Sequence, residues 1–262
     1  GLKALAALSD NKMLLLTSDK GYVSVDELDE LEHPELAFHG SFSLMVNFHA
    51  ISSYFDMLGG SSYMQQPFDG FATGAFMLGI ESSKMPRANA MLQEQASGFC
   101  PGHYFCLYEH MEKTHEKADL PALASFLTLS HWDPGIFEMF SERIGDLVEG
   151  ADEDVVKYLA TNLPRVADNF YFVPGAHDVL FDIAVFYHEQ SLYQEAILYF
   201  KKSRVYFEDT YEGLFNLGYC YSELGQYTAA KQFFELAVAF DSASREAKDC
   251  LRNTLRKIEV TS

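Results

Sequence analysis

Four cysteine and histidine side chains stand close together in the middle of the chain, at a spacing that could hold a metal ion. The string CPGHYFCLYEH contains Cys100, His103, Cys106 and His110. Thiolates and imidazoles are the ligands that zinc takes in a tetrahedral site. Structural zinc sites usually join two separated ligand pairs, however, and a buried cysteine more often packs as a small apolar residue. We therefore predict no metal in this chain and keep these four residues as the alternative, a zinc site.

The sequence contains none of the common catalytic motifs. Gly-x-Ser-x-Gly, the Walker phosphate loop and His-Glu-x-x-His are all absent. The acidic stretch over residues 26–35 lacks the ligand spacing of a calcium loop, so we expect it to be solvated. Whether the protein is an enzyme stays open on this ground.

The elements expected over residues 1–80 are a strand, a helix and a pair of strands. The apolar run MLLLT at residues 13–17 predicts a strand buried on both faces of a parallel sheet. Residues 46–60 carry apolar side chains at helical spacing and end in two glycines, as a helix does. Residues 61–66 and 71–80 flank a Pro-Phe-Asp-Gly turn and predict an antiparallel pair of strands.

This order of elements resembles the last quarter of a class I S-adenosylmethionine-dependent methyltransferase. The segments LLLTSDKGY, HGSFSLMVNFHAISSYF and LSHWDP are similar to a methyltransferase-like family of the MidA-related type, which carries tetratricopeptide repeats at its C-terminus. The resemblance implies that residues 1–80 are the C-terminal portion of a Rossmann-like sheet of about three strands and that residues 81–176 form a helical connector. The fold class implied is mainly α with a small α/β part.

The same resemblance implies where a ligand would lie, because open parallel sheets bind ligands at the C-terminal ends of their strands. The cofactor-binding candidates at that edge are Thr17, Ser18 and Asp19. The catalytic candidates are Asp19, His39, Asn47 and His49. The alternative is that Asp19 belongs to a solvated turn, that His39 and Ser41 cap the next helix, and that the others bond to nearby loops.

The chain lacks the part of such an enzyme that holds the cofactor. No Gly-x-Gly turn stands between a strand and a helix, so we expect no cofactor in this chain by itself. The chain begins at Gly1 in what reads as the middle of a helix. The expectation is a fragment whose parent protein binds S-adenosylmethionine through sequence upstream.

Two stretches near the C-terminus match each other when residues 177–210 are laid on residues 211–244. The residues that recur are Tyr187, Tyr193, Ala196 and Phe200, which reappear as Tyr221, Tyr227, Ala230 and Phe234. The second copy resembles the tetratricopeptide repeat, which implies two antiparallel helices per repeat. In the first copy Ala184 replaces the close-packing glycine, Ser191 the turn glycine and Ser203 a late alanine. We predict repeats over residues 177–210 and 211–244 and a capping helix over 245–260, with an apolar stripe of Ala247, Leu251, Leu255 and Ile258.

The resemblance to these repeats implies a partner-binding groove along the first helix of each one. The positions that would line it are Asp178, Phe181, Val185, His188, Glu189, Glu212, Phe215, Tyr219, Ser222 and Glu223. This lining is acidic and aromatic, so the expected partner is a protein segment with apolar and basic residues. The alternative is that two repeats and a cap only stabilise the chain or form a homodimer.

Composition sets limits on the remaining functions. The net charge is −19, and most of the excess of acidic over basic side chains lies before Ala176. This distribution argues against nucleic acid as a partner, because phosphate contacts need clustered Lys and Arg. No apolar run is long enough to span a membrane. The four scattered cysteines suit a reducing compartment, so we expect a cytoplasmic protein.

Overall fold

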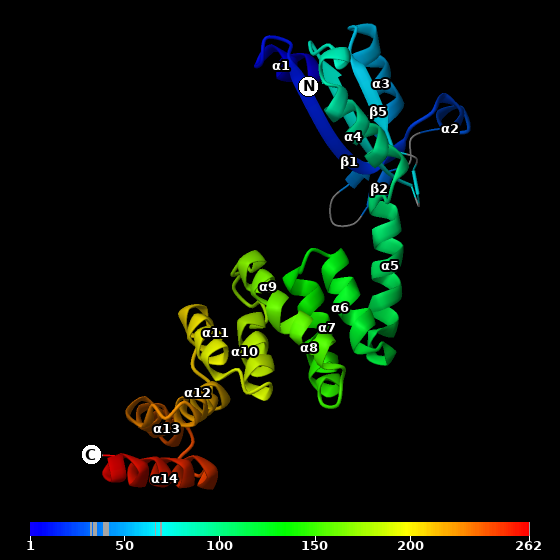
Figure 1. Ribbon diagram of the computed structural model, residues 1–262. Coiled ribbons are helices and arrows are strands. Elements are labelled where there is room, and N and C mark those ends of the chain that lie inside the picture. The colour runs from blue at the N-terminus through cyan, green and yellow to red at the C-terminus, as the bar shows by residue number, and fades with distance from the viewer. Residues whose placement is uncertain (32, 34–35, 39–41, 66, 69, 262) are drawn as a thin grey trace. The chain divides into compact units, whose positions relative to one another are not determined.

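The computed structural model describes residues 1–31, 33, 36–38, 42–65, 67–68 and 70–261 (Figure 1). Over these residues the chain is mainly helical and has a small mixed sheet. Its contacts divide it into two compact units, Gly1–Lys113 and Thr114–Ser262. The helices of residues 81–176, predicted as one connector, are therefore shared between the sheet unit and the repeat unit.

The first unit contains a four-stranded sheet in the order β4-β1-β6-β5. Strand β6 lies between β1 and β5 and is antiparallel to both, as the register pairs Leu15↔Phe76 and Ser62↔Phe76 show. The pair β5–β6 confirms the predicted antiparallel strands. The bounds are β1 (Met13–Tyr22), β4 (Val46–Asn47), β5 (Ser61–Met64) and β6 (Phe71–Leu78). A separate antiparallel pair is formed by β2 (Leu36–Phe38) and β3 (Phe42–Leu44).

The prediction that Met13–Thr17 is a doubly buried parallel strand is wrong. Strand β1 is antiparallel to β6 from Met13 to Lys20 and parallel to β4 only at its last two residues, Gly21 and Tyr22. Its side chains alternate, so that Leu14 and Leu16 are 51% and 64% exposed. A continuous apolar run cannot tell a strand with two covered faces from one whose second face is left open.

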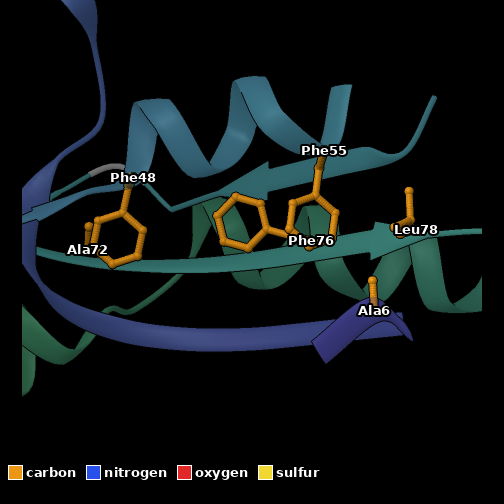
Figure 2. Close-up of a cluster of buried hydrophobic side chains, with 6 residues drawn as sticks. All are labelled: Ala6, Phe48, Phe55, Ala72, Phe76 and Leu78. Carbon is orange, nitrogen blue, oxygen red and sulfur yellow. The ribbon is translucent and has the colours of Figure 1, made fainter. Parts of the chain in front are cut away.

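The predicted helix of residues 46–60 is confirmed as α3 (Phe48–Met57), and it covers one face of the sheet. Asn47 starts it, because its Oδ1 accepts a hydrogen bond from the backbone N–H of Ala50 at 2.7 Å. Phe55 packs its ring on Phe76 of β6, with ring centroids 5.4 Å apart, and Phe48 lies beside Ala72 of the same strand; both rings of α3 are fully buried (Figure 2). These rings make the core of the first unit.

The other helices of the first unit complete its framework. Helix α4 contacts β5 and β6, and a hydrogen bond of 2.9 Å joins Tyr63 Oη to Asn89 Oδ1. The acidic segment predicted to be solvated begins with α2, whose Ser24 and Glu27 form a capping box. The bounds are α1 (Leu2–Ala7), α2 (Val25–Asp29), the 3₁₀ helix η1 (Ser82–Lys84), α4 (Pro86–Ser97) and α5 (Pro101–Thr114).

Over its described residues, the second unit is built from helices alone. It begins with the 3₁₀ helix η2 (His115–Lys117) and continues through α6 (Leu120–Leu129), α7 (Pro134–Val148), α8 (Glu153–Asn162) and α9 (Pro164–Asn169). Asp119 and Asp133 cap α6 and α7, and each of these two helices has Pro in its first turn, where proline is tolerated. Fully buried Trp132 anchors this part, with the guanidinium of Arg165 over its ring at 5.9 Å.

Two helical hairpins and a last helix follow. The first hairpin is α10 (Val179–Glu189) with α11 (Tyr193–Tyr206), and the second is α12 (Tyr211–Glu223) with α13 (Tyr227–Phe240). Helix α14 (Arg245–Thr261) closes the series. Helices α11 and α13 begin and end at equivalent positions of the two copies, as the internal repeat predicts.

Helices α7, α10, α12 and α14 each contact the next, and we call this series the inner row. Helix α7 thus covers the side of the first repeat that has no third repeat before it. Tyr187 of α10 also donates a hydrogen bond of 2.6 Å to the carbonyl oxygen of Ala160. The helices of residues 134–162 therefore complete the packing that two repeats lack alone.

Helix α14 differs from its predicted stripe at one position. Ala247 is fully buried and Leu251 is half-buried, but Leu255 is 38% exposed and Thr254, at 2%, takes the buried place. The hydroxyl of Thr254 donates to the carbonyl oxygen of Cys250 at 2.8 Å, which satisfies it within the helix. A hydroxyl with a partner in its own helix can therefore occupy a buried position that the pattern assigns to leucine.

None of the described helices combines the length and apolar character needed to cross a membrane.

Candidate functional site

Ring pairs that recur with the repeat join the two helices of each hairpin. Tyr187 stacks on Tyr199, with ring centroids 5.5 Å apart and planes inclined by 11°. At the equivalent place in the second hairpin, Tyr221 stacks on Phe233 at 5.5 Å and 6°. These stacks tie the first helix of each hairpin to the second, so the first helix presents its other face outward.

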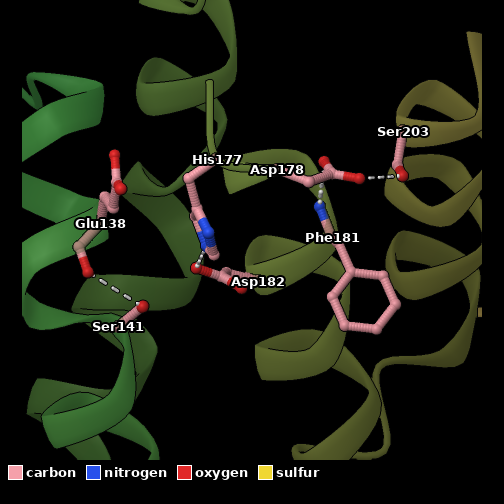
Figure 3. Close-up of polar contacts among 7 residues, drawn as sticks. All are labelled: Glu138, Ser141, His177, Asp178, Phe181, Asp182 and Ser203. Atoms are coloured by element: carbon pink, nitrogen blue, oxygen red, sulfur yellow. Dashed lines mark hydrogen bonds and ion pairs between the residues drawn. The ribbon is translucent and has the colours of Figure 1, made fainter. Parts of the chain in front are cut away.

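The residues that differ between the two copies are accommodated locally. Ser191 has φ 57° where Gly225 has φ 70°, so the first copy keeps the turn geometry with a serine in the left-handed region. The hydroxyl of Ser203, which replaces an alanine, donates to Asp178 Oδ2 at 2.5 Å. The backbone N–H of Phe181 donates to the other carboxylate oxygen of Asp178 at 3.0 Å. Asp178 is therefore a helix cap as well as a predicted groove residue (Figure 3).

A cavity of about 730 Å³ lies between α7 and α10. It falls within the range of ligand-binding pockets. Its apolar floor comes from both helices, and its rim is acidic. The apolar lining residues are Phe137, Met139, Ile144, Phe181, Val185 and Phe186. The polar and charged ones are Glu138, Ser141, Glu142, Asp146, His177, Asp182 and Glu189, and Gly145 completes the lining. We call this cavity the α7–α10 groove.

The rim of the groove is nearly free of compensating positive charge. No lysine or arginine is among the described residues that line it. Within the same set, Asp182 is the only rim carboxylate in an ion pair, with Nε2 of His177 at 2.7 Å. Burial raises the pKa of the Glu189 carboxyl above its usual value. The groove therefore has an excess of carboxylates that a cationic side chain could neutralise.

His177 is the rim residue that changes charge near neutral pH. Burial alone lowers its pKa, but the hydrogen bond to Asp182 and the charges of Asp182, Glu138 and Asp178 outweigh burial and raise it above the ordinary value. Figure 3 shows His177 between Glu138 on α7 and Asp182 on α10. The starts of α7 and α10 therefore lie at the same end of the groove.

A second pocket of about 270 Å³ adjoins this groove on α7. It shares Met139, Glu142 and Asp146 with the larger groove and adds His115, Glu116 and Arg143. The side chain of Arg143 points its Nε to the carbonyl oxygen of Ala118 at 3.4 Å. The carboxylates of α7 thus face two connected hollows.

Further along the inner row, aromatic side chains gather between the two hairpins. The ring of His188 lies edge-on to Tyr219 and to Tyr193, at centroid distances of 5.4 and 6.2 Å. Burial lowers the pKa of His188, whose Nε2 is buried without a hydrogen-bond partner. The charge of Glu223, with burial second, raises the pKa of Tyr219. Both shifts favour the uncharged forms of His188 and Tyr219.

The predicted groove positions are brought together only in part. Phe181, Val185 and Glu189 line the α7–α10 groove. Phe215 instead stacks on Tyr211 at 5.8 Å and is half-buried. The other positions on α12 lie along the inner row and do not line this groove: Glu212, Tyr219, Ser222 and Glu223.

Sequence reasoning missed the second wall of the groove. Glu138, Glu142 and Asp146 recur every four residues, which places them on one face of α7. The tetratricopeptide repeat pattern does not extend to α7, so it predicts no groove residues on this helix. The spacing of three carboxylates was the signal that could have found them.

The candidates of the first unit form no comparable site among its described residues. Ser18 Oγ is hydrogen-bonded to Thr73 Oγ1 at 2.9 Å across the sheet, and the Asp19 carboxylate accepts from the backbone N–H of Lys20 at 2.7 Å. Thr17 lies beside them in β1, Asn47 caps α3, and His49 lies in its first turn. His39 and Ser41 lie outside the described residues.

The end of β1 that follows Thr17, Ser18 and Asp19 is closely packed. The edge of β1 beside Gly21 is filled, because a Cβ there would lie 2.3 Å from the carbonyl oxygen of Val46 and 2.6 Å from the ring of Phe48. We derive no chemical step from Thr17, Ser18 or Asp19.

Two members of the cysteine and histidine string, Cys100 and His103, take part in local packing. The backbone N–H of Cys100 donates to Nδ1 of His103 at 3.1 Å, and the His103 ring stacks on Phe68 at 4.2 Å. Cys100 is buried, whereas Cys106 is exposed. No group of three or more possible metal ligands was found in the described part of the chain, in which Cys100, His103, Cys106 and His110 all lie.

Comparison with known proteins identifies one segment. The model of the tetratricopeptide repeat family matches residues 211–244, the hairpin α12–α13 with the turn that follows. A search of curated proteins found no match. The fold and this comparison together show that the chain contains a tetratricopeptide repeat. Such repeats generally bind protein partners.

Proposed function

We propose that this protein is a protein-interaction module of the tetratricopeptide repeat type, which binds a partner along the inner row. The observation that carries the proposal is the α7–α10 groove, where residues of the first hairpin meet the acidic face of α7. The module is not catalytic as an isolated chain in this proposal.

The partner that suits this surface is a protein segment with apolar and basic residues. Nucleic acid is disfavoured by the net charge of −19. The four cysteines are free thiols, which fits a cytoplasmic location. Self-association into a homodimer is the competing use of the same inner row.

Site-directed photo-crosslinking in the full chain tests the proposal. A photoreactive amino acid replaces Glu189 or Tyr219 on the inner row, and a matched one replaces Leu198 of α11, which is 49% exposed. We expect the inner positions to crosslink to another protein and Leu198 not to. Equal crosslinking from all three positions, or none from any, contradicts the proposal. Crosslinks to a second copy of this chain support the homodimer.

A second candidate rests on the sheet. Strand β1, helix α3 and the pair β5–β6 follow one another in the order of the methyltransferase resemblance, with β6 between β1 and β5. The open face of β1, with exposed Leu14 and Leu16, would then be covered by further sequence of a parent enzyme. This candidate places the cofactor S-adenosylmethionine upstream of Gly1. Calorimetric titration of the full-length parent protein with S-adenosylmethionine tests it, and no heat of binding would exclude it.

A further inference from the structure

The α7–α10 groove has an apolar floor between two acidic ends. Glu138 and Asp182 lie near the starts of their helices, and His177 is at that end as well. Asp146 and Glu189 lie in the last turns of α7 and α10 and line the rest of the groove with Glu142. Met139 of α7 and Val185 of α10 lie along the floor between these groups, whereas the ring of Phe181 turns away to pack on Phe200 of α11 (Figure 3).

The two ends of the groove differ in whether a cation of the protein already neutralises their carboxylates. At the first end Asp182 is paired with His177, and this pair is part of the fold. At the second end Glu142, Asp146 and Glu189 form no ion pair in the described part of the chain. Like charges that face one hollow repel each other, and a bound cation removes that repulsion.

We propose that the groove binds a short segment of a partner protein in which an apolar side chain fills the floor and a neighbouring Lys or Arg is held by Glu142, Asp146 and Glu189. The inference rests on the proposed function and adds the chemistry of the partner and the place where it binds. The charge complementarity selects this occupant over an acidic or a purely apolar segment. Two of these three carboxylates come from α7, which lies outside the repeats, and Glu189 comes from the first repeat.

The basic side chain of the partner is bound at only one end of the groove. His177 in its protonated form already supplies a cation beside Glu138 and Asp182. The bound segment is therefore oriented, with its basic residue toward the ends of α7 and α10 and its apolar side chain toward Met139 and Val185. A segment with the same composition in reverse order places the basic residue beside the imidazolium and binds more weakly.

A peptide selection on the full chain tests the inference. A library of short random peptides is displayed on phage, the enriched peptides are synthesised, and their affinities are measured by fluorescence anisotropy. We expect enriched peptides to carry Lys or Arg next to Leu, Ile, Phe or Met, and their binding to weaken with added salt. Enrichment of peptides without basic residues, or no enrichment at all, overturns the inference.

Matched variants locate the bound peptide. The pair Glu142→Gln and Asp146→Asn together removes two groove charges, whereas Glu149→Gln and Glu153→Gln remove two exposed carboxylates that do not line the groove. We expect the first double variant to weaken binding about fivefold or more and the second less than about twofold. Equal effects of the two double variants place the peptide elsewhere and overturn the inference.

The result is separable from that of the photo-crosslinking. If Glu189 or Tyr219 crosslinks to a partner but the selection shows no preference for basic peptides, the proposed interaction module is supported and the proposed partner chemistry is wrong. If basic peptides bind through Glu142 and Asp146 but no crosslink to a cellular protein forms, the proposed groove chemistry is supported and the proposed function is wrong.

Discussion

Gly218 of α12 lies directly against the ring of Phe234 of α13. A Cβ at residue 218 would approach Cδ1 of that ring to 2.7 Å, a distance that side chains do not tolerate without movement. The first hairpin has Ala184 and Phe200 at the equivalent places, both buried. The second hairpin is thus closed more tightly by a contact that only glycine permits.

We predict that Gly218→Ala lowers the free energy of unfolding by about 1–3 kcal/mol, because the methyl group forces the two helices apart. Urea denaturation measures the change. The control is Gly145→Ala in α7, where no atom lies within 4 Å of the added Cβ. That substitution is expected to raise stability by about 0.5–1 kcal/mol through helix propensity. Equal effects at the two positions would show that the contact with Phe234 is not tight.

Asp178 is expected to matter for stability. Its carboxylate caps α10 and accepts a hydrogen bond from the hydroxyl of Ser203. Asp178→Ala therefore removes the cap and leaves the buried hydroxyl of Ser203 without this acceptor. The expected cost in free energy of unfolding is about 2 kcal/mol. A double-mutant cycle with Ser203→Ala measures the coupling. Additive losses would mean that the hydroxyl does not depend on Asp178.

The pair of His177 and Asp182 predicts a stability that depends on pH. Because the folded-state pKa of His177 is raised, the pair stabilises fully below the ordinary histidine pKa, and this stability is lost as pH rises through the folded-state value. His177→Gln should therefore cost stability at about pH 5.5 and almost none at about pH 8.5. The side chain is 46% exposed, so the cost is at most about 1 kcal/mol.

Urea denaturation of both proteins at the two pH values measures this difference. Asp182→Asn should weaken the same pH dependence, because it removes the hydrogen-bonded carboxylate and leaves only the charges of Glu138 and Asp178 to hold the imidazolium. A loss that is larger at the higher pH would contradict the assignment of His177.

Cys220 should be unreactive in the folded protein. Burial raises the pKa of its thiol to about 12, so very little thiolate forms at neutral pH. Cys106 is exposed and should react first with a thiol reagent. Mass spectrometry of the protein after brief labelling identifies the modified residues. Rapid labelling of Cys220 without denaturant would show that the second hairpin opens readily.

The hairpins could be predicted from the sequence because their spacing is set by local packing. Tyr187 and Tyr221, or Phe200 and Phe234, recur at the shift that two packed helices require. The strand at Met13–Thr17 could be placed, but its covered faces could not. Which faces are buried depends on α3 and α4, elements far away in the sequence.

Only the part of the candidate site that lies on the first helix of a repeat could be predicted from the sequence. Val185 and Glu189 follow from the first helix of a repeat, and both line the groove. The carboxylates Glu142 and Asp146 belong to a helix without a repeat pattern, and their importance comes from its contact with α10. The spacing of the carboxylates places them on one face of α7, but the sequence does not show which helix that face packs beside.

Hydrogen exchange of the full chain, with and without a selected basic peptide, tests the central claim most directly. The account predicts added protection in residues 137–146 of α7 and 181–189 of α10, and none in the sheet of the first unit. The variant with Glu142→Gln and Asp146→Asn should lose that protection at the same peptide concentration. Protection confined to other helices or to the sheet, or protection unchanged in the variant, would contradict the claim that the α7–α10 groove binds the partner.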